Sequence, residues 1–197
     1  MNSKNKKAKW LPYKKRKLDS LNLSEACAEA LLGRGLPKDA HQMFVRNPKR
    51  ELEIRDLPNC GRSAFLGQFD DGDHTYWLRL SDESIWLLDG YDDDDEQDTR
   101  WVNSSVAGLQ GVLAAWDDFM SSGLSEDDDR YDTAISEVTE RAHQADLKAF
   151  EDEDSWWSLN FDEIEIGAIG PEGDSDDPTD DIVFVSYAED PYPEDDE

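Results

Sequence analysis

Residues 65–120 read FLGQFDDGDHTYWLRLSDESIWLLDGYDDDDEQDTRWVNSSVAGLQGVLAAWDDFM, and the pattern in this stretch decides the fold. Apolar runs at 65–69, 75–80 and 85–88 are separated by short turns rich in Asp, Gly and Ser. Aromatic and β-branched runs broken by such turns are typical of consecutive antiparallel strands. A further extended run follows at 101–105. We therefore expect an antiparallel meander at the centre of the chain.

An amphipathic helix is expected directly after this meander. Ser104 or Ser105 can cap its first turn, and Gly123 can end it. Apolar side chains recur in it at steps of three and four, in the order Val106, Leu109, Leu113, Trp116 and Met120. Gly108 and Gly111 each weaken helix formation by about 1 kcal/mol relative to Ala. We expect these two glycines to let the helix approach the sheet closely.

Further elements are predicted on both sides of this centre. Ser24 can cap a helix over residues 25–32. The residues expected to face inward in that helix are Ala26, Ala30 and Leu31. Residues 51–56 alternate as in a half-exposed strand, residues 131–150 carry a helical apolar stripe, and residues 182–187 read as a strand. A cluster expected to pack at the edge of the core comprises Trp156, Trp157, Leu159 and Phe161. The predicted fold is a single α+β domain, mainly an antiparallel twisted sheet flanked by helices.

Charge is concentrated unevenly along the chain. The sequence has 48 acidic and 20 basic residues and a net charge of −28, yet residues 1–17 contain eight Lys or Arg and no acid. We expect residues 1–19 to form a basic flexible arm, residues 20–187 a folded domain with acidic loop insertions, and residues 188–197 an acidic disordered tail. Two alternatives are that residues 10–13 dock on the body of the domain, or that the arm lies against the acidic surface of the protein.

The charge and the lack of targeting signals narrow the class of function. A strongly negative field repels nucleic acids and anionic lipid and attracts cationic partners. The sequence has no apolar segment typical of a signal peptide, and no run near the about 20 apolar residues needed to span a bilayer. Cys27 and Cys60 lack CxxC or metal-site spacing, which indicates inert thiols in a reducing compartment. We expect a cytoplasmic protein without a direct nucleic-acid or membrane partner.

No catalytic motif is present in the sequence. It contains no nucleophile elbow, phosphate-binding loop, Rossmann glycine pattern or HExxH segment. His41, His74 and His143 lie far apart along the chain, and carboxylates are too abundant for any pair to be informative. Aromatic residues alternate with acids rather than with Lys or Arg, which argues against a nucleic-acid platform. We predict no enzymatic activity, no catalytic residues and no cofactor.

The densest acidic segment is residues 92–98, with six acids in seven positions. Its acids, the candidate contact residues of the chain, are Asp92, Asp93, Asp94, Asp95, Glu96 and Asp98. Mutual repulsion predicts an exposed loop. A calcium-binding loop is disfavoured, because Gln97 replaces the required Gly and Asn103 replaces the final Glu. We predict no metal site. The loop is either part of a contact surface or a solvated loop on an unrelated face.

Several short motifs occur in a recognisable order. Gly35-Leu36-Pro37 follows a short helix, Phe65-Leu66-Gly67 opens the meander, and Arg79-Leu80 and Ile85-Trp86 flank its second turn. Val102-Asn103-Ser104-Ser105 then leads into the apolar helix. Over about residues 20–120 this order resembles the SUKH superfamily, particularly its SUKH-4 immunity-protein branch. The resemblance implies a single α+β domain in which a sheet is flanked by helices.

The resemblance also implies an immunity function. Proteins of this family bind and neutralise a cognate polymorphic toxin in the producing bacterium or its kin, and such toxins are often nucleases or nucleic-acid deaminases. An acidic protein suits the cationic groove of such a toxin, so the expected partner is a basic toxin contacted through residues 92–98. The alternative is an acidic regulatory interaction protein or DNA mimic that binds basic nucleic-acid-binding proteins. Asn103 and Ser105 are expected to be structural, and Trp77 and Trp86 to belong to the core.

Overall fold

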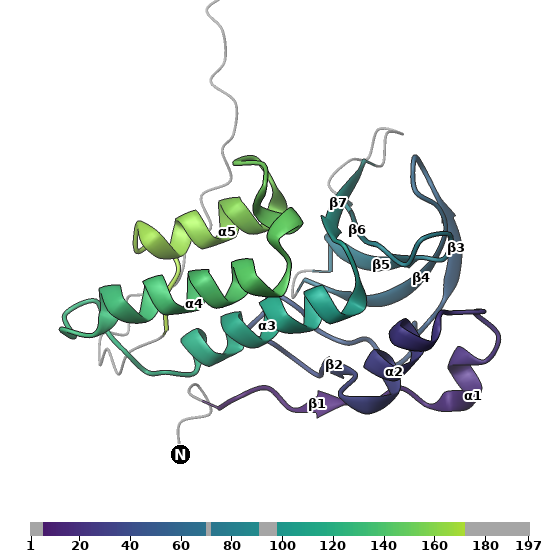
Figure 1. Cartoon of the computed structure of the whole chain (residues 1–197), viewed down its shortest axis with the longest axis horizontal. Coiled ribbons are helices and arrows are strands. Elements are labelled where there is room, and N and C mark those ends of the chain that lie inside the picture. The colour runs from purple at the N-terminus through teal and green to yellow at the C-terminus, as the bar shows by residue number, and fades with distance from the viewer. Residues whose placement is uncertain (1–5, 70–71, 91–97, 172–197) are drawn as a thin grey trace, which may run out of the picture.

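The computed structural model describes residues 6–69, 72–90 and 98–171 (Figure 1). Its elements, in chain order, are β1 (Trp10–Leu11), α1 (Lys15–Leu18), α2 (Glu25–Gly33), β2 (Leu36–Pro37), β3 (Ile54–Leu57), β4 (Gly61–Gln68), β5 (Thr75–Arg79), β6 (Ile85–Leu88), β7 (Thr99–Asn103), α3 (Val106–Met120), α4 (Tyr131–Ala145), the 3-10 helix η1 (Leu147–Phe150) and α5 (Trp156–Glu165). Strands β3 to β7 form one antiparallel sheet in chain order, and β1 pairs with β2. The predicted α+β fold and its meander are confirmed.

The boundaries of the strands differ from the prediction by a few residues. Strand β4 begins at Gly61 rather than at Phe65, because Asn59 and Gly61 take up positive φ angles of 52° and 76° and make the turn there. Strand β7 covers residues 99–103 rather than 101–105, since Ser105 already caps α3. The predicted strand at residues 182–187 lies outside the described residues.

The five-stranded sheet is strongly curved (Figure 1). Its edge strands β3 and β7 come together at one end, where the Thr99 hydroxyl donates to the carbonyl oxygen of Pro58 over 2.8 Å. A β-bulge between Phe65 and Gly67 interrupts the pairing of β4 with β5. A Cβ atom on Gly67 would lie 2.4 Å from the ring of Phe44. Bulges increase strand bending and twist, and here the bulge also brings the backbone against a buried ring.

Helix α3 supplies most of the helical side of the core. All five residues of its predicted apolar stripe are buried, and Ser105 accepts a hydrogen bond from the amide of Gly108 as its cap. The prediction for α2 is correct in position, in its Ser24 cap and in the burial of Leu31, and Ala30 packs partly buried against the core, but it wrongly placed Ala26 inward and missed Cys27. The buried residues of α2 are Cys27 and Leu31, whereas Ala26 is exposed. Cys27 is the larger apolar side chain, so its burial removes more surface from water.

The helix predicted over residues 131–150 ends at Ala145, and η1 follows after Asp146. Asp146 leaves the helical conformation and turns its side chain toward the start of α3. The close approach expected of Gly108 and Gly111 is therefore made to this region and not to the sheet. A Cβ atom would lie 2.4 Å from Asp146 Oδ2 at Gly108, and 2.4 Å from the Ala145 Cβ at Gly111.

The aromatic cluster predicted after α4 lies on helix α5. Trp157 and Phe161 are buried against the core, Trp156 is half-buried, and Leu159 is 41% exposed. The inclusion of Leu159 in the core edge was therefore wrong. The helical period explains this result, because residues two apart on a helix point in very different directions.

The second half of the basic arm is docked on the domain. Strand β1 pairs with β2, and the buried hydroxyl of Tyr13 donates to the carbonyl oxygen of Leu66. The amide of Ala8 donates to the buried carboxylate of Asp117 over 2.8 Å. Among the alternatives for the arm, docking of Trp10–Tyr13 is the one observed. The division of the chain at residues 19 and 187 stays a prediction.

Candidate interaction site

The described residues include only one member of the predicted acidic contact site. Asp92, Asp93, Asp94, Asp95 and Glu96 lie outside them, whereas Asp98 is described and exposed. Its carbonyl oxygen accepts a hydrogen bond from the amide of Asp89 over 3.0 Å, and its carboxylate accepts one from the amide of Thr99 over 2.7 Å. The first bond continues the β6–β7 ladder, and both bonds fix the position of Asp98 at the base of the predicted loop.

The base of this loop is connected to helix α5 through His74. The Nε2 atom of His74 lies 3.3 Å from Asp89 Oδ1, and its ring lies 5.5 Å from the ring of Trp156 at the start of α5. The indole nitrogen of Trp156 donates to the hydroxyl of Tyr76, which donates to the carbonyl oxygen of Met43. Asp89 and the first residue of α5 are thus parts of one packed region.

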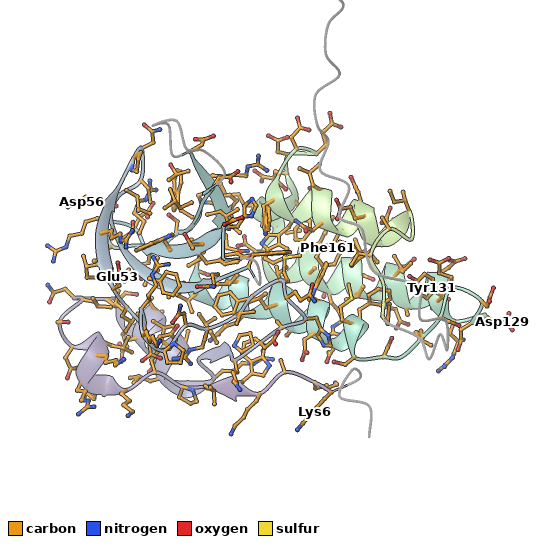
Figure 2. All side chains as sticks on the ribbon, turned by 180° about the vertical axis from the view of Figure 1, so that it is seen from behind. Lys6, Glu53, Asp56, Asp129, Tyr131 and Phe161 are labelled. Atoms are coloured by element: carbon orange, nitrogen blue, oxygen red, sulfur yellow. The ribbon has the colours of Figure 1, made fainter. Side chains whose placement is uncertain are left out.

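Charge is segregated in the described part of the chain. Residues 6–69 contain fourteen Lys or Arg and seven Asp or Glu, whereas residues 98–171 contain four basic and eighteen acidic residues. The acidic excess therefore belongs to helices α3 to α5 and their connections. Figure 2 shows Asp129 at the far end of the molecule from Glu53 and Asp56. The labelled acids thus lie at both ends of the molecule, and the net negative charge of residues 98–171 attracts cationic surfaces.

The sheet face opposite α2 and α3 carries a row of aromatic side chains across four strands. In register, the row is Phe65, Trp77, Trp86 and Trp101. Cationic groups cover it: the guanidinium of Arg50 lies 4.2 Å from the ring centre of Phe65, that of Arg79 lies 4.6 Å from Trp86, and the Lys148 ammonium lies 5.1 Å from Trp101. The sequence analysis did not predict these contacts between cations and rings, because Arg50 and Lys148 lie outside the strands that carry the aromatic rings.

Acidic side chains hold two of these cations in place. Arg50 donates to Glu53, and Arg79 binds Asp82, which holds the pKa of Asp82 well below its usual value. Trp77 is fully buried and Trp86 is half-buried beneath these side chains. The arginines thus close the second face of the sheet, where they cover the rings rather than leave them open for stacking with bases.

One constellation resembles a catalytic triad in composition but not in geometry. His41 Nε2 lies 3.0 Å from Ser121 Oγ and 3.2 Å from Asp117 Oδ1. A Ser-His-Asp triad requires the serine and the carboxylate to contact opposite nitrogens of the imidazole ring, whereas both contact the same nitrogen here. Asp117 also accepts the amide of Ala8. This cluster therefore anchors the N-terminal segment and does not form a charge-relay arrangement.

The described ranges contain no candidate metal site and no candidate reactive thiol. Within residues 6–69, 72–90 and 98–171, no three His, Cys, Asp or Glu side chains are grouped as metal ligands would be. Cys27 and Cys60 are buried as expected, and burial raises the pKa of the Cys27 thiol to about 12. Within the same ranges, none of the helices has the length and apolar character required to cross a bilayer.

The Asn103-Ser104-Ser105 segment forms a polar junction around the buried side chains of Asn103 and Asp146, in agreement with the structural role expected of Asn103 and Ser105. Asp146 Oδ2 accepts the Asn103 side-chain amide over 3.0 Å and the Ser104 backbone amide over 2.7 Å. The side-chain Oδ1 of Asn103 accepts the indole N–H of Trp157 over 2.9 Å. This junction joins β7 and α3 to the end of α4 and to α5, so it orients the acidic helices on the sheet.

Comparison with known proteins identifies a family. A family model described as SUKH-4 immunity protein matches residues 11–163, which run from strand β1 into helix α5. No curated protein and no solved structure matches the chain.

Proposed function

The chain belongs to the SUKH-4 immunity protein family, and on this premise we propose that it binds a cognate protein toxin and neutralises it without catalysis. The family membership is the observation that carries this proposal. The protein acts in the cytoplasm of the bacterium that produces the toxin, or of its kin, where the toxin would otherwise reach its target. Immunity of this kind requires only a complementary surface.

The partner is a basic toxin, such as a nuclease or a nucleic-acid deaminase. The net charge of −28 and the concentration of acids in residues 98–171 support this choice. Enzymes that act on nucleic acids present cationic surfaces to the phosphate backbone. An acidic protein is drawn to such a surface by long-range attraction and can block it once bound.

The acidic loop is part of the contact surface in this proposal. Its residues are Asp92, Asp93, Asp94, Asp95, Glu96 and Asp98. Asp98 is exposed at the base of the loop, which suits a charged contact with a partner. Neutralising these acids should weaken binding mainly through a lower association rate, because steering depends on charge.

Co-expression with the neighbouring gene tests the function. Cells that express this chain together with a toxin encoded beside it should grow, whereas cells that express the toxin alone should not. The purified proteins should then form a complex with nanomolar affinity. Lack of protection against the products of all adjacent genes would contradict the proposal. Binding to several unrelated basic proteins would favour the alternative of a general acidic regulator or DNA mimic.

A charge-matched pair of variants tests the loop. One variant changes the six loop acids to Asn or Gln. The other changes the six acids of residues 188–197, which are Glu189, Asp190, Glu194, Asp195, Asp196 and Glu197. Both variants lose the same charge, so a larger decrease in association rate for the loop variant supports a local contact. Equal decreases would mean that net charge alone acts.

A further inference from the structure

Helix α5 presents an apolar pair to solvent. Leu159 is 41% exposed and Ile166, which directly follows the helix, is 79% exposed. These two and Leu147 on η1 are the large apolar residues that stand out as exposed among those the structure describes. Seven residues make nearly two helical turns, so Leu159 and Ile166 share one face, about 10 Å apart along the axis. Exposed apolar side chains that gather on one face are typical of binding sites.

The buried side of α5 confirms that this face points away from the core. Trp157, Phe161 and Ile164 are fully or almost fully buried, and they occupy the opposite side of the helix. The pair is therefore not an incomplete part of the core seen from its edge. It is a pair of apolar side chains on the side of the helix away from the core, and its exposure to water costs free energy unless a partner covers it.

Acidic residues surround the apolar pair. Asp162 and Glu163 are exposed between its two members, and Glu165 is exposed beside them. The carboxylate of Glu126 approaches from another segment, since a Cβ atom on Gly167 would lie 2.9 Å from its Oε1 atom. Helix α5 contains no Lys or Arg. Apolar anchors within a charged rim are the usual anatomy of a protein interface.

The acidic residues around the apolar pair indicate which kind of partner binds there. A second copy of this chain that paired through the same face would place acids against acids, and the C-terminal segment that follows the described residues is itself rich in acids. We propose that the outer face of α5 is a docking surface for a basic protein toxin, with Leu159 and Ile166 as its apolar anchors. This inference rests on the proposed function and adds to it a surface that holds the partner after the acidic field has attracted it.

Replacing both apolar anchors with acids separates the effect of the apolar contact from that of long-range electrostatic attraction. The full-length variant with Leu159→Glu and Ile166→Glu keeps the sign of the field but removes the apolar contact. The probe is the purified product of the adjacent gene against which the unaltered chain protects cells. We expect the dissociation rate to increase about tenfold or more, with an association rate that is unchanged or higher. Leu147→Glu, an exposed leucine on η1 rather than on α5, is the matched control and should bind like the unaltered chain.

The outcomes distinguish this inference from the proposed function. If the unaltered chain neither protects nor binds, the proposed function fails. If it does both and the double variant dissociates at the same rate, only the docking surface is overturned. An unchanged dissociation rate with faster proteolysis after residue 171 would assign the face to the C-terminal segment. An unchanged rate with loss of self-association in sedimentation would assign it to a second copy.

Discussion

At the scale of single residues, Gly108 controls how closely α3 approaches Asp146. Gly108→Ala would place a methyl group 2.4 Å from Asp146 Oδ2, on an atom that already accepts the bonds from Asn103 and Ser104. We expect a loss of about 1–3 kcal/mol in the free energy of unfolding, typical of overpacking. Urea unfolding followed by fluorescence measures it.

Gly33→Ala is the control for this change. Gly33 ends helix α2, and nothing lies within 4 Å of a Cβ atom built on it. Alanine is a better helix former than glycine by about 1 kcal/mol, so this variant should be as stable as the unaltered protein or slightly more stable. Equal effects of the two substitutions would contradict the steric explanation for Gly108.

The thiol of Cys27 provides a second residue-scale prediction. Burial raises its pKa to about 12 from an ordinary value of 9.0. Because the thiolate is the reactive form, the folded protein at pH 8 should react with a disulfide reagent far more slowly than the urea-unfolded chain. Rapid labelling of Cys27 in the folded state, identified by peptide mapping, would contradict the observed burial.

At the scale of elements, local signals predicted the strands well and long-range contacts were missed. Turn residues such as Asp, Gly and Ser mark strand ends within a few positions, so the meander could be read directly. The end of α4 could not be predicted from the sequence, because the hydrogen-bond partners of Asp146 lie more than 40 residues earlier in the chain. The cations over the aromatic row and the exposure of Leu159 likewise depend on packing and not on neighbouring sequence.

The ion pairs of Glu51 join the arm to the segment before β3. Burial tends to raise the pKa of Glu51, but Lys17 and Arg46 outweigh it and hold the pKa below the ordinary value of 4.5. A carboxylate with a lowered pKa stabilises the folded state above its unfolded value, and this stabilisation is lost as the pH falls. We expect the free energy of unfolding to decrease from about pH 5 downward, and Glu51→Gln to make that decrease smaller. Urea titrations at several pH values measure the slope, and an unchanged slope would contradict the prediction.

At the scale of the whole molecule, the excess of acidic residues should control how fast a cationic partner binds. The association rate with the toxin should decrease by about tenfold or more when ionic strength is raised from about 0.05 M to about 0.5 M. The dissociation rate should change little, because close contacts are screened less than distant ones. Stopped-flow mixing measures both rates. A salt-independent association rate would contradict steering by the acidic half.

The net charge was evident from the sequence, but its arrangement in space was only partly predictable. The basic residues 1–17 were recognised as a block, yet their docking through Ala8 and Tyr13 depends on Asp117 and Leu66, which lie far along the chain. The acidic segment 92–98 was predicted to be a loop from its local charge density alone, and this stays a prediction, whereas the exposed face of α5 requires knowing which side of the helix is buried. Surface geometry therefore had to come from the fold.

The hydrogen bond from Thr99 to Pro58 has a consequence for behaviour at high concentration. Exposed edge strands of a sheet can pair with strands of other molecules and start amyloid-like aggregation. The edge strand β3 is only four residues long and bears the charged side chains of Arg55 and Asp56. The other edge strand, β7, lies against η1 and α5. The curvature of the sheet brings both edge strands together at one end, so they offer few backbone groups with which a strand of a neighbouring molecule could pair. Overproduction in the cell should therefore yield dispersed protein rather than inclusion bodies.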